Sequence, residues 1–256
     1  MKNKDLTDFH VHFGQYNNEY FYPQRVVDDL AKRKITEAWI SSTTSCMYCR
    51  EQHPELKNQP NAKQIVDAVN EEFNLAINHA KLYGIKIHPL YWLVPEFEKS
   101  GVYFEKYFSK ILNQLHVDSL QSHSEFISKS VLYDGFKIHP RAQTWDFSNA
   151  TTFELAERVF SFAEQNKLRI LIHTGNDSVD CPRKFEPFIA KYSKCIVQLA
   201  HIKKTDEAIY MLNNYSNVVF DTAFSSQENI LKMQNKGFAN RLVYGSDFPI
   251  KDHTNL

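Results

Sequence analysis

Eight short apolar segments alternate along the chain with stretches of helical periodicity. Each apolar segment ends in a loop that contains His, Asp, Ser, Thr or Gly. The segments are Asp8–His12, Glu37–Ser41, Ile85–His88, Gly135–His139, Arg169–His173, Cys195–His201, Asn217–Asp221 and Arg241–Gly245. Mostly continuous apolar strands separated by helices are typical of a parallel sheet that helices cover. Eight such units in 256 residues predict an α/β fold, the closed (β/α)8 TIM barrel.

The alternative fold is an open, doubly wound sheet, which usually carries a glycine-rich phosphate loop after an early strand. The sequence shows no such loop and contains only seven glycines. Since no linker or low-complexity tract divides the chain, we expect residues 1–256 to form a single barrel domain. Only nine residues follow Asp247, so we expect a reduced or missing eighth helix.

Capping residues indicate where several helices begin and end. Pro23 is favoured in the first turn of a helix, and Gly84 is expected to end the helix over residues 62–83. Thr151 or Thr152 is expected to cap the helix that ends at Asn166. Further helices are predicted over residues 182–192, 205–213 and 226–236, and two short ones between residues 100 and 130.

The composition excludes several classes of protein. Thirty basic and 30 acidic residues give a formal net charge of zero, which does not favour capture of nucleic acid or of an anionic membrane. The scattered cysteines, Cys46, Cys49, Cys181 and Cys195, do not form a disulfide framework, and we interpret the Cys46–Cys49 pair as loop cysteines. No segment has the apolar core of a signal peptide or the length of a membrane span. We therefore expect a cytoplasmic protein that acts on a small molecule, and a homodimer is compatible with the sequence.

The segment Asp8-Phe9-His10-Val11-His12 has the pattern of a metal-binding strand. Side chains alternate between the two faces of a strand, so His10 and His12 point the same way as Asp8. Two imidazoles on one face can reach one divalent cation, and a further carboxylate or histidine would complete a site for zinc or a similar ion. A half-buried strand whose histidines bind backbone groups is the other interpretation.

Polar residues also follow most of the other strands. In a (β/α)8 barrel the carboxyl ends of the strands meet at one face, where the chemistry of such proteins takes place. The residues at these ends are His10, His12, Lys137, His139, His173, His201, Asp221 and Asp247. Their equivalent places in successive units favour a shared metal site over a set of unrelated buried histidines and turn aspartates.

Five motifs in this order resemble the amidohydrolase superfamily, and specifically its amidohydrolase-2 branch. That branch contains aminocarboxymuconate-semialdehyde decarboxylase, resorcylate-type decarboxylases and lactonases. The motifs span nearly the whole chain: Asp8-Phe9-His10-Val11-His12, Gly135-Phe136-Lys137-Ile138-His139-Pro140, Ile172-His173-Thr174-Gly175, Leu199-Ala200-His201 and Tyr244-Gly245-Ser246-Asp247-Phe248-Pro249.

The resemblance implies that His10, His12, His173 and Asp247 bind a divalent metal ion, which we expect to be Zn²⁺, with Mn²⁺ and Fe²⁺ as alternatives. It also implies that His201 and Asp247 are catalytic: Asp247 accepts and delivers protons, and His201 orients water or stabilises an oxyanion. Asp8 is expected to orient the histidines or to bind backbone amides.

Four further residues are candidates for substrate binding: Lys137, His139, Arg141 and Arg50. In binuclear members of the superfamily a carboxylated lysine bridges two metals at the place of Lys137. We expect Lys137 to contact substrate instead. Arg50 and Arg141 lie in loops and are able to hold a carboxylate.

The residues favour a metal-dependent hydrolase in which activated water attacks an amide, ester or lactone carbonyl of a small molecule. The alternative is a metal-dependent lyase that decarboxylates a small carboxylic acid without oxidation. The metal ligands are the same for both reactions, so the sequence does not separate them. A metal-binding barrel without turnover is disfavoured, because binding alone does not require the acid–base pair of His201 and Asp247.

Overall fold

The computed structural model describes residues 6–16, 18–48, 62–99, 101, 103–108 and 131–250. Cys49 and Arg50 lie outside the described residues. So do most of the segment expected to form two short helices and the end of the chain, where an eighth helix would lie.

Among the described residues, nine strands form one sheet in the order β2-β1-β3-β4-β5-β6-β7-β8-β9. All neighbours from β1 to β9 are parallel, and β2 is an additional antiparallel strand at the edge. The strands are β1 Thr7–Tyr16, β2 Glu19–Phe21, β3 Glu37–Ser42, β4 Lys86–Trp92, β5 Gly135–Ile138, β6 Arg169–His173, β7 Ile196–Ala200, β8 Val218–Asp221 and β9 Leu242–Val243. The strand β4 is longer than predicted, because it continues through Pro89 to Trp92.

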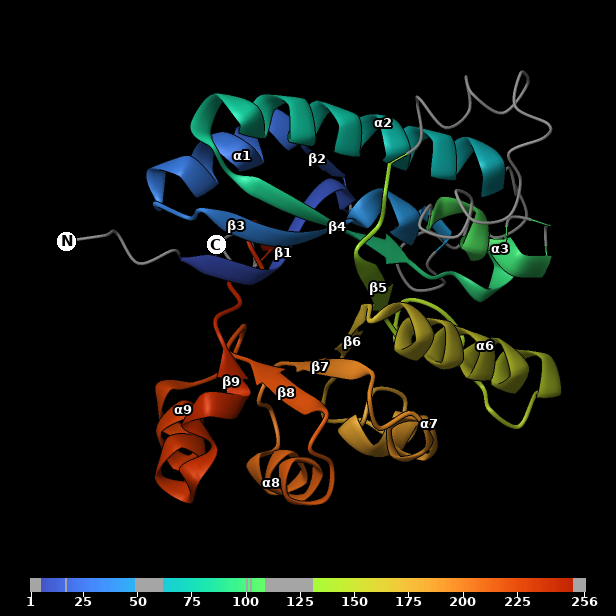
Figure 1. The fold of residues 1–256 in the computed structure, drawn as a ribbon, viewed down its shortest axis with the longest axis vertical. Coiled ribbons are helices and arrows are strands. Elements are labelled where there is room, and N and C mark those ends of the chain that lie inside the picture. The colour runs from blue at the N-terminus through green and yellow to red at the C-terminus, as the bar shows by residue number, and fades with distance from the viewer. Residues whose placement is uncertain are drawn as a thin grey trace.

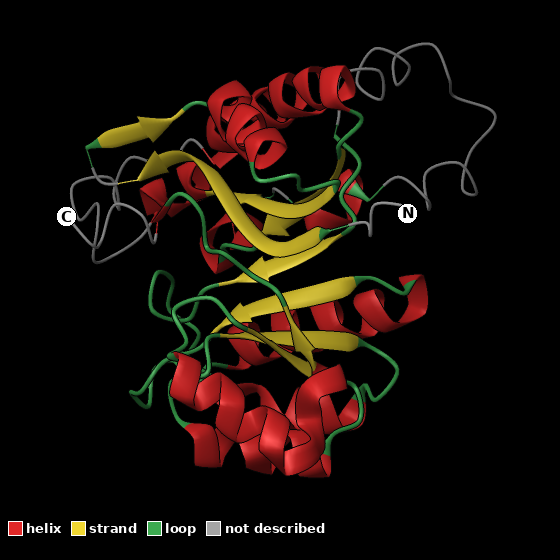
Figure 2. Cartoon of the chain, turned by 90° about the vertical axis from the view of Figure 1, so that its left-hand side faces the viewer, coloured by secondary structure: helices red, strands yellow, loops and turns green. Residues whose placement is uncertain are grey.

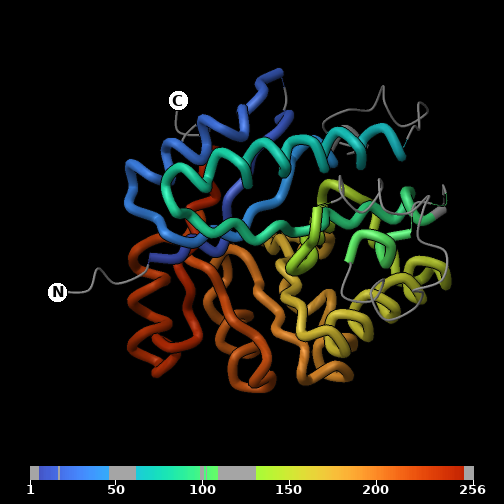
Figure 3. The backbone as a smooth tube through the Cα atoms, turned by 45° about the horizontal axis from the view of Figure 1, so that its top comes forward, coloured from blue at the N-terminus to red at the C-terminus, as the bar shows by residue number. Residues whose placement is uncertain are grey.

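The segment that follows β9 closes the ring against β1. Tyr244 O accepts from the Phe9 N–H at 2.9 Å, and the Asp247 N–H donates to His10 O at 2.8 Å. The His12 N–H donates to Phe248 O, also at 2.8 Å. The end of the described chain therefore lies beside its beginning (Figure 3). These bonds join both edges of the eight-stranded parallel sheet, and the predicted (β/α)8 barrel is confirmed.

Helices surround the strands on the outside, as Figures 1 and 2 show. They are α1 Pro23–Lys32, α2 Ala62–Ala80, α3 Pro95–Lys99, α6 Ala150–Asn166, α7 Glu186–Lys191, α8 Thr205–Asn214 and α9 Gln227–Met233. Each longer helix turns one apolar face to the sheet; in α1 this face is Val26, Val27 and Leu30. Within the described residues, no helix combines the length and the apolar character needed to cross a membrane.

The ends of the helices follow the capping residues, with one correction. Pro23 begins α1, and Gly84 ends the turn after α2 in a left-handed conformation with φ of 67°. The prediction that Thr151 or Thr152 caps α6 is wrong. Asn149 is the cap, and its side chain accepts from the Thr152 N–H at 3.2 Å. The helix begins earlier than its apolar face suggests, so the two threonines lie within its first turn.

Replacement of this cap is expected to lower stability by a small, measurable amount. Asn149→Ala removes an acceptor for one of the unpaired N–H groups of the first turn, which costs about 1 kcal/mol. For a chain of this size the midpoint of thermal unfolding is expected to fall by about 2–4 °C. Thr151→Ala is the control, because Thr151 is exposed and does not cap the helix. Equal effects of the two substitutions in thermal unfolding would contradict the assignment.

Candidate metal centre

The predicted ligands converge at the carboxyl ends of the strands, where they line one cavity of about 250 Å³. The cavity is lined by His10, His12, Tyr16, Thr43, Trp92, Lys137, His139, His173, His201, Lys203, Phe224, Asp247 and Ile250. Every described residue that the sequence proposed as a metal ligand or catalytic group is in this set. His10 and His12 face the same cavity, as expected, although the register of β1 against β3 shifts between Asp8 and Val11.

Two imidazole nitrogens and one carboxylate oxygen form a compact triangle in the cavity. His10 Nε2 lies 3.2 Å from His12 Nε2. Asp247 Oδ1 lies 2.9 Å from His12 Nε2 and 3.6 Å from His10 Nε2. Ligand atoms on a tetrahedral zinc ion, with bonds of about 2.0–2.1 Å, are separated by about 3.3–3.4 Å. The triangle thus has the size of one face of such a coordination shell.

Hydrogen bonds on the other ring nitrogens define which tautomers these histidines adopt. The Nδ1 atoms of His10 and His201 lie against oxygen acceptors: His10 against Asp221 Oδ2 at 3.0 Å and His201 against Ala223 O at 2.9 Å. The His12 Nδ1 lies 3.0 Å from the Ser41 hydroxyl and 3.2 Å from Ser41 O, so it either accepts from the hydroxyl or donates to the carbonyl. Carboxylate and carbonyl oxygens only accept, so a neutral ring donates its Nδ1 proton to them and keeps an unprotonated Nε2. This is the form in which a histidine binds a metal ion.

Burial and neighbouring charges select the protonation states that bind a cation. Burial, reinforced by Lys137, lowers the pKa of His10 to about 4. Burial also lowers the pKa of His201. Burial alone would raise the pKa of Asp247, but His10, His12 and His201 outweigh it and hold this pKa well below its usual range. His10 and His201 are therefore neutral and the Asp247 carboxylate is ionised at neutral pH, as cation binding requires.

The triangle brings together three potential metal ligands. When His12 donates its Nδ1 proton to Ser41 O, its Nε2 repels His10 Nε2 and Asp247 Oδ1 unless positive charge lies among them. The Lys137 ammonium supplies part of this charge, since its Nζ lies 2.9 Å from His10 Nε2. Two nitrogens and an ionised oxygen at these distances suit a divalent ion such as Zn²⁺, so the donor set fits the metal that the sequence implies.

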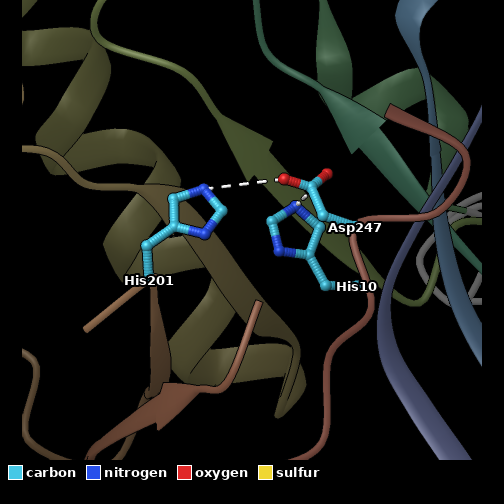
Figure 4. A group of neighbouring side chains, drawn as sticks. All are labelled: His10, His201 and Asp247. Carbon is cyan, nitrogen blue, oxygen red and sulfur yellow. Dashed lines mark ion pairs between the residues drawn. The ribbon is translucent and has the colours of Figure 1, made fainter. Parts of the chain in front are cut away.

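His173 and His201 form a second pair beside the triangle. The His173 Nδ1 lies 3.2 Å from His201 Nε2, which in turn lies 3.7 Å from Asp247 Oδ2. Figure 4 shows His201 and His10 facing Asp247, and the donor atoms of these three residues lie within 4.8 Å of one another. His173 therefore lies beside the triangle through its contact with His201, and its role as a metal ligand stays a prediction.

Lys137 and His139 are also part of the cavity wall. Lys137 is only 1% exposed, so it belongs to the floor. The His139 Nδ1 accepts from the Ala142 N–H at 3.0 Å, which leaves the proton of the neutral ring on Nε2. The His139 ring lies parallel to that of His173 at 3.9 Å between centroids, and on its other side stacks on Trp92 at 5.6 Å. His139 thus offers the cavity an N–H donor.

The structure does not support a substrate-binding role for Arg141. Its Nε donates to Asp180 Oδ2 at 2.9 Å, and its Nη2 donates to Asp177. Arg141 is absent from the cavity lining. Its guanidinium instead compensates the charge of the buried Asp180 carboxylate. The sequence could not show this pairing, because the two aspartates lie 36 and 39 positions away in another loop.

Asp221 and Gln198 hold the candidate ligands in place, and neither of them was assigned a role from the sequence. Asp221, at the end of β8, is fully buried and accepts from His10 through Oδ2 and from the His201 N–H through Oδ1 at 3.1 Å. Gln198 on β7 donates to the same Oδ2 at 2.8 Å. Asp221 was recognisable as one more polar residue at a strand end. Asp8 behaves as expected of a backbone partner, accepting from the N–H groups of His10 and Ser246.

Asp221→Asn is expected to weaken metal binding, although Asp221 is not one of the proposed metal ligands. The amide cannot accept as a carboxylate does, so the His10 tautomer and ring orientation are less well defined. Loss of such an outer partner typically costs about 10–100-fold in metal affinity. The measurement is a competition titration with a zinc chelator, with the exposed Asp206→Asn as control. Unchanged affinity would remove Asp221 from this role.

The comparisons with known proteins give structural matches only. No family model matches the chain, and no curated protein gives a significant match. A phosphotriesterase homology protein from Escherichia coli, solved with phosphate in its active site, superposes with a TM-score of 0.59 at 11% identity, covering 95% of this chain and 82% of that protein.

Two further solved structures have the same architecture. A mutant organophosphorus hydrolase from Deinococcus radiodurans superposes with a TM-score of 0.53 at 11% identity. The superposition covers 95% of this chain and 75% of the hydrolase. A TatD-like protein from Archaeoglobus fulgidus has a TM-score of 0.51 at 11% identity, with coverage of 94% and 85%. At this level of identity the similarity demonstrates a common barrel fold and does not single out a branch of any family.

Proposed function

We propose that the protein is an amidohydrolase-type, metal-dependent hydrolase that cleaves an amide, ester or lactone bond of a small molecule. The observation that carries the proposal is the triangle of His10 Nε2, His12 Nε2 and Asp247 Oδ1, three potential ligand atoms within 3.6 Å of one another at the mouth of a barrel. Proteins named phosphotriesterase homology protein and organophosphorus hydrolase share the fold, which is consistent with hydrolysis.

Asp247, His201 and Lys137 have different roles in the proposed reaction. His10, His12 and Asp247 would hold a divalent ion, which would supply a Lewis acid that promotes the ionisation of water at neutral pH. Asp247 has a second oxygen, Oδ2, directed toward His201, which is able to take a proton from the attacking water and return it to the leaving group. His201 orients that water through its unprotonated Nε2. Lys137 places positive charge beside the cavity, where an oxyanion would develop.

Decarboxylation is the alternative reaction at this site. It requires a cation that anchors the acid to be lost, and since Arg141 is already paired with two aspartates, this task would fall to a lysine of the cavity lining, Lys137 or Lys203. The amidohydrolase-2 branch, the small-molecule substrate, the homodimer and the cytoplasmic location remain predictions.

The test is a substrate panel run with protein that carries Zn²⁺ or Mn²⁺ and with chelated protein. The panel contains amides, esters, lactones and carboxylated aromatic acids, and the products measured are amine, acid and carbon dioxide. Cation-dependent release of amine or acid is expected. Release of carbon dioxide would favour the decarboxylase, and a purified protein that binds no divalent ion would overturn both.

A further inference from the structure

Lys203 introduces a positive charge at the mouth of the cavity. It lies in the loop between β7 and α8, two residues after His201, and is exposed although it lines the cavity. Its Nζ lies 5.1 Å from the centroid of the Phe224 ring. In the part of the chain that the structure describes, no carboxylate lies within ion-pair distance of this ammonium. Lys203 differs in this from Arg141, whose charge is compensated by aspartates.

Hydrogen bonds between two loops define the position of Lys203. The N–H of the preceding residue, Ile202, donates to Ser225 Oγ at 2.8 Å, and its carbonyl accepts from the Asn229 side chain, also at 2.8 Å. On the two sides of Ile202, the loop after β7 is thereby joined to Ser225 in the loop after β8 and to Asn229 in the first turn of α9. These two hydrogen bonds hold the backbone next to Lys203 at the rim of the cavity.

Phe224 links Lys203 to the candidate metal centre. Its φ of 49° lies in the left-handed region, which is unfavourable for a residue with a bulky side chain. Such strain persists where the surroundings impose it, and it is common at ligand sites. The edge of the Phe224 ring contacts His201 at 5.5 Å between centroids, while its face is near Lys203. The Phe224 ring therefore forms the part of the cavity wall between His201 and the Lys203 ammonium.

The cavity as a whole favours an anionic ligand with an apolar body. Its charged lining residues are Asp247, Lys137 and Lys203, and a bound divalent ion would add further positive charge. Tyr16, Trp92, Phe224 and Ile250 supply apolar and aromatic walls. The Lys137 ammonium faces His10 at the floor, which leaves Lys203 as the cation at the entrance. The volume of about 250 Å³ is below the ~300–1,000 Å³ usual for drug-sized ligands, so the ligand is small.

We propose that Lys203 is a specificity-determining residue that binds a carboxylate of the substrate, remote from the bond that is cleaved. The substrate class is then a small aromatic or aliphatic acid that also carries an amide, ester or lactone. A lysine suits this task because its ammonium is a point charge on a flexible stem, which Phe224 covers. The cleavable bond in this description rests on the proposed function, but binding of the carboxylate does not.

Equilibrium binding tests the proposal without turnover. Benzoate, phenylacetate and 3-phenylpropionate are titrated calorimetrically into zinc-loaded and chelated protein, each beside its uncharged amide. At least one acid is expected to bind more tightly than its amide. In Lys203→Met this preference should fall about three- to tenfold, while the affinity for the amide stays unchanged. A rise in salt from about 0.05 to 0.5 M should reduce the preference in the wild type and not in the variant.

Two variants serve as controls. Lys203→Arg retains the charge and should retain the preference. Lys204→Met removes the same charge from the neighbouring exposed position, which does not line the cavity, and should leave the preference intact. The proposal is overturned if no acid binds better than its amide, if Lys203→Met keeps the preference, or if Lys204→Met loses as much.

The two proposals fail separately. Hydrolysis of neutral esters without any preference for acids would overturn the role of Lys203 alone. A preference for acids that depends on Lys203, in a protein that hydrolyses no member of the panel, would overturn the hydrolase alone.

Discussion

Asp247→Asn is expected to lower kcat by about 10²–10⁴-fold on any substrate that the wild type hydrolyses. The amide cannot accept a proton, and it replaces the charged member of the ligand triangle. The fold should be retained, because Asp247 adopts a positive φ of 55°, a conformation that asparagine tolerates well. The measurement is a comparison of steady-state kinetics and metal content between variant and wild type.

Asp206→Asn is the matched control for this substitution, because it removes the same charge from an exposed side chain on α8. It should leave kcat unchanged. Wild-type turnover by Asp247→Asn would remove Asp247 from the mechanism. Loss of turnover with a full complement of metal would instead assign its main role to proton transfer.

Removal of the metal is expected to abolish turnover and to lower thermal stability markedly. A ligand that binds only the folded state at about 1,000 times its Kd stabilises that state by about 4 kcal/mol. At about 2–4 °C per kcal/mol, a chelator should lower the unfolding midpoint by about 8–16 °C, and added Zn²⁺ should restore it. The physical reason is that His10, His12 and Asp247 come from opposite ends of the chain, so only the folded state offers all three to one cation.

His12→Ala is the control for metal removal, because it deletes one corner of the triangle. Its unfolding midpoint should respond little to chelator or to zinc. Metal analysis distinguishes one ion from two: if a second ion binds at the His173–His201 pair, His173→Ala should lose one ion and retain the other. A wild type that contains no metal and has the same midpoint in chelator would disprove the metal centre.

The barrel could be predicted from the sequence because its signals are local. Alternation along Asp8–His12 and the helical spacing after Pro23 depend on neighbouring residues only, and the period of a strand or helix repeats within a few positions. The order of eight such units then indicated a ring, and the presence of His10, His12, His201 and Asp247 on one cavity follows from that ring. Their roles as ligands and catalysts remain predictions.

Partnerships across the barrel were decided only by the tertiary structure. Asp221 meets His10 from 211 positions away, and Arg141 turns to Asp177 and Asp180. Nothing in the local sequence pattern distinguishes an arginine that binds substrate from one that forms a salt bridge with a neighbouring loop. Such contacts depend on strand register and on barrel closure, which bring side chains within 3 Å only after the whole sheet has formed. For the same reason Lys203 was visible in the sequence only as one of 30 basic residues, and it became a candidate when the loops around it were assembled.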